Sequence, residues 1–441
     1  MTEPRIYLHI GVPKTGTSAL QEAGHTLREA LAQEGVCYPR TPGLRNHVLL
    51  AVYASDDARS STVLPRILSL LAGRGALDES TSVAPSKGTS SDERPSDVVD
   101  LFDDEAYSSF RESFPELLKT EIVESGCQKV VLSNEQLSWQ LKPTEVQRLA
   151  DLLRTISSDI RVVVYLRRQD ELALSLLSTA IKQGFRYPNL KLGKRNRKFN
   201  YALMLKSWAR VFGKEALIVR VYEKARLKNG DLLADFASVV GFTGDESGEF
   251  PSRKRGRRLD AVSLKFLREF NRHVPTFIDS SWNPLRDHVG DTLEAMSSES
   301  NPMGWSGDPL DEVLQRFAES NAQVAREYLN SEEGKLFSDS PIADYEAEPK
   351  LSVTKAIEIA AHLWISKQEE VIRLHDRLAA KQEQVVRLQE RLAEKSSLLR
   401  KELLGKALVE KAESAKSKQT EPRFRRVDDR VALGPSEETT P

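Results

Sequence analysis

Four short apolar runs recur in the first half of the chain, and segments with helical spacing lie between them. The runs are residues 5–11 ("RIYLHIG"), 129–133 ("KVVLS"), 160–166 ("IRVVVYL") and 216–222 ("ALIVRVY"). A strand that is apolar on both sides is buried on both faces, as in a parallel sheet covered by helices. The sequence therefore predicts an α/β fold with a P-loop-like parallel sheet flanked by helices, over residues 1–345.

Residues 78–97 ("DESTSVAPSKGTSSDERPSD") interrupt this alternation with almost no large apolar residue. Such a composition buries too little surface to offset the entropy lost on ordering, which predicts a disordered surface insertion. The same argument predicts a disordered tail at 413–441.

A 14-residue repeat follows the α/β region. Residues 367–380 ("KQEEVIRLHDRLAA") are echoed by residues 381–394 ("KQEQVVRLQERLAE"), two heptads later. Apolar side chains fall at a and d positions, which Lys381 and Lys395 interrupt at d. We predict a long helix over 352–412 that forms a coiled coil and a homo-oligomer, with a single solvated helix as the alternative.

Composition narrows the functional classes. The 441 residues carry a net charge of -1, which argues against a bulk nucleic-acid binder. No apolar run approaches the ~18 residues of a membrane helix, and no signal peptide is evident at the N-terminus, so no membrane span is expected. Two cysteines imply no disulfide framework, and we expect a reducing, cytoplasmic location.

The segment "GVPKTGTS" (11–18) joins the first predicted strand to a predicted helix. Its two glycines have the spacing of the phosphate loop G-x-x-x-x-G-K-[ST], but Thr17 stands in the lysine position and Lys14 lies inside the loop. Backbone N–H groups and the helix dipole make such a junction an anion site.

A triphosphatase needs that missing lysine for the β- and γ-phosphates, and an acidic ligand for magnesium. No Asp follows the strands at 129–133 or 160–166. The loop therefore favours an anion other than a metal-bound triphosphate, and no Cys/His/Asp spacing predicts a metal site. A degenerate P-loop kinase and an ordinary glycine turn remain as alternatives.

"HIGVPKTGTSALQ" closely resembles the 5′-phosphosulfate loop of sulfotransferases that use 3′-phosphoadenosine-5′-phosphosulfate (PAPS), especially the bacterial carbohydrate-type branch. The resemblance implies the sulfotransferase fold. It also implies that Lys14 stabilises the leaving phosphate, and that Thr15, Gly16, Thr17 and Ser18 belong to the cofactor-binding loop. A fixed cation and N–H donors suit the charge that develops during sulfonate transfer.

A second motif supports the resemblance. The family carries an Arg after a later strand and a Ser eight residues on, both of which bind the 3′-phosphate. "VVVYLRRQDELALS" supplies Arg167 and Ser175 with that spacing. Arg168 is the competing candidate for binding the 3′-phosphate. The alternative for Arg168 is a solvated charge on the surface. Whether the basic run 253–258 ("RKRGRR") also contacts the cofactor stays open.

The acceptor hydroxyl needs a base. The glycosaminoglycan-type branch has S-x-E after its second core strand, which points to Glu135, with Ser133 as a possible contact. The alternative for Glu135 is a helix-start acid after Asn134. His9 is expected to pack in the core, and His47 is a weaker candidate for an acceptor contact.

The resemblance, which runs over most of residues 5–340, implies transfer of sulfonate from PAPS to a hydroxyl acceptor, a glycan or glycolipid. A non-enzymatic alternative is a coiled-coil scaffold with an inactive nucleotide-binding domain.

Overall fold

The computed structural model describes residues 3–56, 104–185, 190, 192–243, 259–278, 281–286, 289–297, 310–339 and 350–418. Three segments discussed above, the insertion at 78–97, the basic run at 253–258 and residues 419–441 of the tail, lie outside the described residues.

A five-stranded sheet forms the centre of the described α/β region, in the order β2-β3-β1-β4-β5, and every neighbouring pair is parallel. The strands are β1 (Arg5–His9), β2 (Val36–Cys37), β3 (Lys129–Ser133), β4 (Ile160–Leu166) and β5 (Leu217–Val221). The prediction of a parallel α/β sheet is confirmed, and β2 is a strand that the sequence did not reveal.

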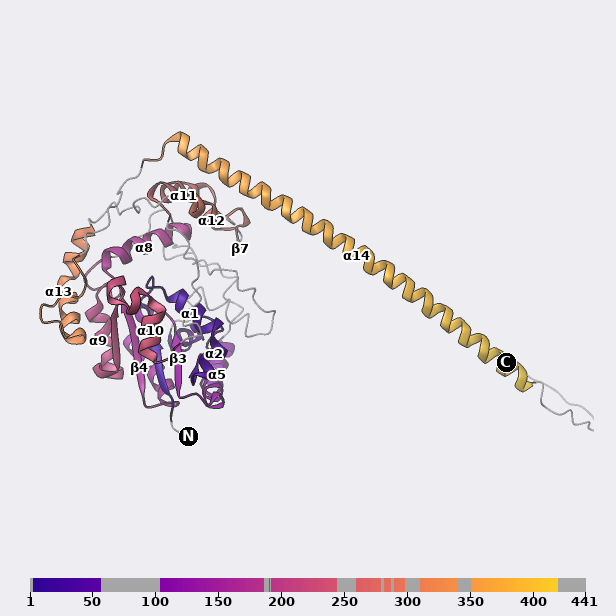
Figure 1. Ribbon diagram of the computed structural model, residues 1–441, viewed down its shortest axis with the longest axis horizontal. Helices are drawn as coiled ribbons and strands as arrows, with labels where there is room; N and C mark the ends of the chain where they lie inside the picture. The colour runs from indigo at the N-terminus through magenta and orange to yellow at the C-terminus, as the bar shows by residue number, and fades with distance from the viewer. Residues whose placement is uncertain are drawn as a thin grey trace, which may run out of the picture. The chain divides into compact units, whose positions relative to one another are not determined.

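Helices connect these strands (Figure 1). They are α1 (Thr17–Thr26), α2 (Arg28–Gln33), α3 (Val48–Ala54), α5 (Asp104–Ser125), α6 (Leu137–Gln140), α7 (Pro143–Arg154), α8 (Gln169–Lys182), α9 (Tyr201–Phe212), α10 (Leu232–Val240), α11 (Ala261–His273), α12 (Val289–Met296), α13 (Leu310–Leu329) and α14 (Val353–Lys418). A short antiparallel ribbon, β6 (Phe277–Ile278) and β7 (Ser281–Trp282), precedes α12.

Alternate residues of the central strands feed two cores on opposite faces of the sheet. Ile6 and Leu8 of β1 join the larger core, which contains buried residues of α3, α5, α7, α9 and α13. Tyr7 of β1 and Val163 of β4 join the smaller core with α1, α2 and α10. Both faces are thus covered, which explains why these strands are apolar throughout.

The strand order creates a topological switch point beside β1. The chain leaves β1 through α1, on the smaller-core face, toward the β2 edge, whereas it leaves β4 through α8 and α9 toward β5. In open parallel sheets, ligands bind at the carboxyl ends of the strands where such connections diverge. The loop at 10–16 and the arginines after β4 both lie at this edge.

The chain divides into two compact units, residues 1–363 and 364–441. The first turns of α14 belong to the first unit, because Ile359 is fully buried against α8, α11 and α12. The sequence placed the domain boundary at 345, before α14, whereas the structure divides the chain within that helix. Among the described residues, no helix is long and apolar enough to cross a membrane.

Candidate functional site

The loop after β1 stays attached to β4 over its first residues. The Val12 N–H donates to the Tyr165 carbonyl at 3.0 Å, and the Tyr165 N–H donates to the Gly11 carbonyl at 2.7 Å. These bonds continue the β1–β4 ladder past the end of β1. They place the beginning of the loop at the switch point, beside the end of β4.

Glycine is required at both ends of the loop. Gly16 has a φ of +82°, and a Cβ there would lie 2.6 Å from Leu232 Cδ2. Gly11 has a φ of +103°, and a Cβ there would lie 3.1 Å from both Cα and Cβ of Glu135. The absence of a side chain at Gly11 therefore lets the loop approach the segment that carries Glu135.

The polar residues of the loop have different exposures. The Thr15 hydroxyl donates to the Val12 carbonyl at 2.6 Å and is buried, so it braces the loop from within. Thr17 is buried, Lys14 is half-buried with a left-handed φ of +69°, and Ser18 is exposed. Lys14 and Ser18 are thus the accessible side chains of this set.

Helix α1 begins at Thr17, and no side chain caps its N-terminus. Gly16, the residue at the cap position, has no side chain with which to accept the first N–H groups. Backbone donors at an uncapped helix start, with the positive end of the helix dipole, suit an anionic group.

Arg167 joins the end of β4 to the loop. Its Nη1 donates to the Lys14 carbonyl at 2.7 Å, and its Nη2 lies 3.1 Å from Glu171 Oε2. Its guanidinium carbon lies 5.8 Å from the centre of the Tyr222 ring. The structure therefore brings Arg167 and the loop of Lys14 together, as the two motifs predict.

Arg168 has a different environment. The interpretation of Arg168 as a solvated surface charge is wrong: the residue is 5% exposed, and its Nε and Nη2 donate to the two carboxylate oxygens of Asp170, both at 2.9 Å. Asp170 is also buried. This bidentate pair stabilises the turn from β4 into α8. Arg168 therefore has a structural role.

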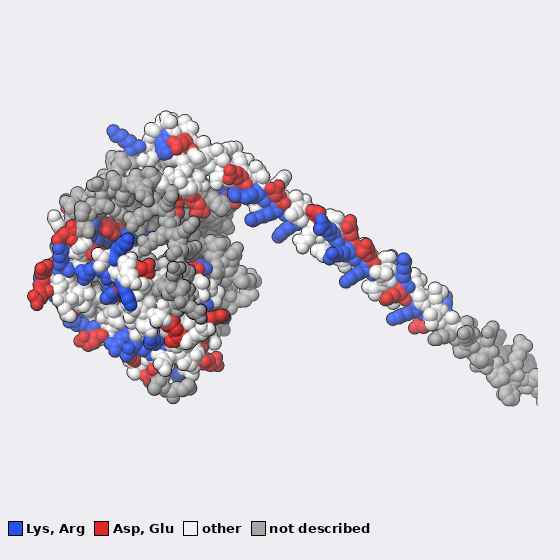
Figure 2. All heavy atoms as spheres, in the orientation of Figure 1, with Lys and Arg blue, Asp and Glu red and all other residues white. Residues whose placement is uncertain are grey.

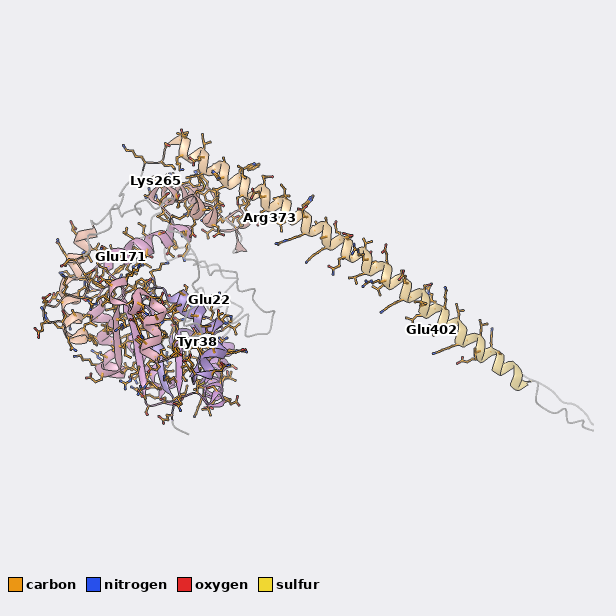
Figure 3. All side chains as sticks on the ribbon, viewed as in Figure 1. Glu22, Tyr38, Glu171, Lys265, Arg373 and Glu402 are labelled. Atoms are coloured by element: carbon orange, nitrogen blue, oxygen red, sulfur yellow. The ribbon has the colours of Figure 1, made fainter. Side chains whose placement is uncertain are left out.

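Ser175 lies in α8 and is half-buried. Its carbonyl accepts a hydrogen bond from the Thr179 hydroxyl at 2.8 Å. The hydrogen bonds of the described residues do not join Ser175 to Arg167 or to the loop. Glu171, which is labelled in Figure 3, pairs with Arg167. It precedes Ser175 by one helical turn on α8.

Glu135 is held by a residue of α1. Gln21 Nε2 donates to Glu135 Oε2 at 2.8 Å and lies 3.5 Å from Ser133 Oγ. Ser133 Oγ in turn lies 2.9 Å from His9 Nδ1. A chain of polar groups therefore runs from the end of β1 through Ser133 and Gln21 to the Glu135 carboxylate.

Glu135 also stands where the alternative of a helix-start acid after Asn134 places it, two residues before the first residue of α6. The side chain of Asn134 takes the turn-forming role, because its Oδ1 accepts the Gln136 N–H at 2.8 Å. The Glu135 carboxylate accepts from Gln21 instead, and the residue is half-buried.

Two histidines support the site from the interior. His47 Nδ1 accepts the Ser133 N–H at 3.0 Å, and the residue is fully buried, so it fixes the end of β3 and does not offer its ring to an acceptor. His9 packs edge-on against Tyr165 and Phe236, which matches the expectation of packing. Burial lowers the pKa of His9 to about 3, and burial followed by the charge of Arg28 lowers the pKa of His47 to about 3.

Sequence reasoning missed three residues of this site: Gln21, Glu171 and Tyr222. Gln21 lies one helical turn beyond Thr17, so its placement on the loop side of α1 was visible from spacing alone. Tyr222 follows β5, and its hydroxyl would lie 3.4 Å from a Cβ at Gly16. Only the strand order, which places β5 next to β4, shows that Tyr222 reaches Arg167.

Together these residues can form an anion site. It would combine Lys14, the uncapped N–H groups of α1 and Arg167, with the Glu135 carboxylate beside the loop. Among the described residues, no group of three or more His, Cys, Asp or Glu side chains could hold a metal ion.

Comparison with known proteins gives one similarity. No protein-family model matches the chain, and no solved structure matches it. An uncharacterized protein of Archaeoglobus fulgidus is 25% identical over 203 residues, which are 45% of this chain and 55% of the relative. The match thus spans about half the length of the curated relative.

Proposed function

We propose that the protein is a sulfotransferase, which moves the sulfonate group of PAPS to a hydroxyl acceptor. The observation that carries the proposal is the hydrogen bond from Arg167 to the carbonyl of Lys14, which joins the two phosphate-binding motifs at one edge of the sheet. The motif order and the parallel sheet suit the sulfotransferase fold.

The loop is assigned to the 5′-phosphosulfate end. Backbone N–H groups at Gly16, Thr17 and Ser18 bind its oxygens, and the hydroxyl of Ser18 adds a donor. Lys14 neutralises the charge on the bridging oxygen as the sulfur–oxygen bond breaks. Thr15 contributes by holding the loop, because its hydroxyl is already bonded to Val12.

Arg167 and Ser175 are assigned to the 3′-phosphate. A guanidinium binds phosphate through paired N–H donors, and the partly exposed Glu171 is a partner that a phosphate can displace. Arg168 takes no part, because it is buried and bound through two nitrogens to Asp170.

Glu135 is the proposed base. The acceptor oxygen attacks sulfur, its proton moves to the Glu135 carboxylate, and the bond between sulfur and the bridging oxygen breaks. The products are a sulfate ester and 3′-phosphoadenosine-5′-phosphate. Gln21 holds the carboxylate through its 2.8 Å hydrogen bond to Oε2, which leaves Oε1 to take the proton.

The acceptor class follows from the family resemblance, which favours a glycan or glycolipid. The cytoplasmic location remains a prediction from the sequence. A kinase with a degenerate loop is less well supported. A kinase needs an acidic ligand for magnesium. Ser133 ends β3 and Asn134 follows it. The residues directly after β4 are Arg167 and Arg168. The nearby Asp170 is paired with Arg168.

The test is transfer of isotopically labelled sulfonate from PAPS to a panel of glycan, lipid and small hydroxyl acceptors, without added metal. We expect labelling of at least one acceptor class, lost in Lys14→Ala. Calorimetric titration of 3′-phosphoadenosine-5′-phosphate gives a readout that needs no acceptor. A protein that binds magnesium–ATP and does not bind this nucleotide would overturn the proposal.

A further inference from the structure

The second unit of the chain carries a long helix whose apolar residues have no cover. The a-position side chains of α14 from Trp364 to Leu399 are each more than half exposed, and from residue 371 to 412 every residue of the helix is exposed. They are Trp364, Val371, Leu378, Val385, Leu392 and Leu399. A row of this length in water calls for a partner surface of the same period.

The d positions from 367 to 395 alternate between two residue types. Leu374 and Leu388 occupy two of them, and Lys367, Lys381 and Lys395 occupy the others. Lys367 pairs with Glu370 on its own helix at 2.8 Å. Lys381 and Lys395 have no acidic residue three or four positions away, so their own helix does not compensate their charges.

This alternation discriminates between two orientations of a dimer. In a parallel, in-register coiled coil each d residue faces its own copy, so Lys381 faces Lys381 and Lys395 faces Lys395. In an antiparallel coiled coil a residues face d residues, so each lysine faces an apolar side chain and extends its ammonium group into water. We propose that residues 364–399 form an antiparallel coiled coil with a second copy of this chain.

Charge complementarity selects the alignment. When the two helices cross midway between Ala379 and Ala380, Val371 faces Leu388 and Leu374 faces Val385 of the second copy. The same alignment sets Glu370 beside Arg391 at the flanking g positions, twice by symmetry, and sets Lys395 against the ring of Trp364. Sliding each helix by half a heptad toward residue 383 brings Arg377 beside Arg391 instead.

The charges along the helix are otherwise mixed. Figure 2 shows basic and acidic side chains distributed along α14, without a long block of one sign. Arg373 and Glu402, labelled in Figure 3, lie at c and d positions of the same heptad numbering. Two such helices can therefore approach each other without a large net repulsion.

Spin-label distances on the full chain test the orientation. Cys127→Ser removes the more accessible thiol, and Cys37 is buried with a pKa raised to about 11 by burial, so that it labels slowly. Labels at Ser397→Cys should lie roughly 50 Å apart in the antiparallel dimer, from 1.5 Å of rise per residue. Labels at Glu383→Cys, near the crossing point, should lie within about 30 Å.

Short distances at both positions would mean a parallel dimer and would overturn the proposal. Sedimentation gives the second readout: the full chain should be a dimer and the 1–363 truncation a monomer. A full chain that is monomeric at all concentrations, or a truncation that still dimerises, would also overturn it.

Charge reversal tests the alignment. Glu370→Arg should weaken dimerisation by roughly threefold to thirtyfold, because two exposed pairs are lost and become repulsive. Arg391→Glu in the same chain should restore the affinity. If the double variant is no tighter than either single variant, the crossing point is wrong.

Discussion

Two adjacent arginines show how single residues divide the work at this site. Arg167 contacts the loop carbonyl of Lys14 and a partly exposed Glu171, whereas Arg168 is locked to a buried Asp170. Only the first has a partner that a ligand can replace.

Arg168→Ala should destabilise the fold far more than Arg167→Ala. It leaves the Asp170 carboxylate buried without its cation, which we expect to lower the free energy of unfolding by about 3–5 kcal/mol. Arg167→Ala should cost about 1–2 kcal/mol, since it loses a hydrogen bond and a pair with an exposed carboxylate. Urea denaturation of both variants measures the difference, and equal losses would contradict these assignments.

Glu135→Gln should separate chemistry from binding. The amide oxygen can still accept from Gln21, so the fold and nucleotide affinity should be unchanged. Sulfonate transfer should fall by about 10²–10⁴-fold, because the proton acceptor is gone. Single-turnover transfer at saturating PAPS is the measurement. A variant with full activity would show that another group takes the proton.

The two buried histidines predict loss of stability in mild acid. Their folded pKa is near 3 and the ordinary histidine pKa is 6.5, so below pH 6.5 the unfolded chain binds protons that the folded chain does not. Each should cost about 1.4 kcal/mol per pH unit, or about 2 kcal/mol at pH 5. Urea titrations from pH 7 to pH 5 measure this slope, and His47→Gln should halve it.

At this scale, the sequence identified the residues that have motifs and missed those that depend on packing. Lys14, Arg167 and Glu135 follow strands at fixed offsets, so their meeting at one edge could be predicted. Tyr222 takes part because β5 is the neighbour of β4, and no local sequence pattern contains the strand order. Gln21 lies one helical turn beyond Thr17, so helical spacing alone could have placed it.

Among the elements, the strand–loop–helix unit from β1 to α1 determines the site. Gly16 permits both the left-handed backbone and the close approach of Leu232. Gly35 also has a positive φ, but a Cβ added there would have no neighbour within 4 Å, so this glycine is a matched control.

Gly16→Ala should therefore cost more than Gly35→Ala. The control should lose only about 1–2 kcal/mol for the left-handed conformation. Gly16→Ala should lose more than this, because the end of the buried Leu232 side chain must also shift. It should weaken nucleotide binding about tenfold, since strain at residue 16 acts on the first N–H groups of α1. Thermal unfolding and calorimetry on both variants provide the comparison. Equal nucleotide affinity in the two would remove Gly16 from the site.

Element prediction succeeded where the apolar pattern is strong. The runs at 129–133 and 160–166 are β3 and β4 with the same bounds, whereas the two-residue β2 is too short to show a pattern. Likewise, continuous apolar runs predicted a sheet buried on both faces, but not the strand order that creates the switch point.

For the whole molecule, the boundary between the two units has a measurable consequence. Ile359 and Leu363 of α14 pack on the cluster formed by α8, α11 and α12, so this helix start is part of the first unit. The heptad pattern could not reveal this boundary. The helix keeps the same periodicity where it stops packing on the first unit.

A 1–363 truncation should be as stable as the full chain in its α/β unit, whereas a 1–345 truncation should be less stable. The shorter form exposes the surface that Ile359 covers, and a buried Ile contributes about 2–5 kcal/mol. Thermal unfolding followed by near-ultraviolet circular dichroism compares the two. Identical midpoints would place α14 wholly outside the first unit.

The most direct test of the two-motif site compares two ligands that differ by one phosphate. Calorimetry without magnesium would titrate 3′-phosphoadenosine-5′-phosphate and adenosine 5′-phosphate into the wild type and Arg167→Ala. We predict that the wild type binds the doubly phosphorylated nucleotide at least about a hundredfold more tightly, and that the variant binds both nearly alike. Equal affinities in the wild type, or a preference that survives in Arg167→Ala, would contradict the assignment of Arg167 and with it the proposed nucleotide site.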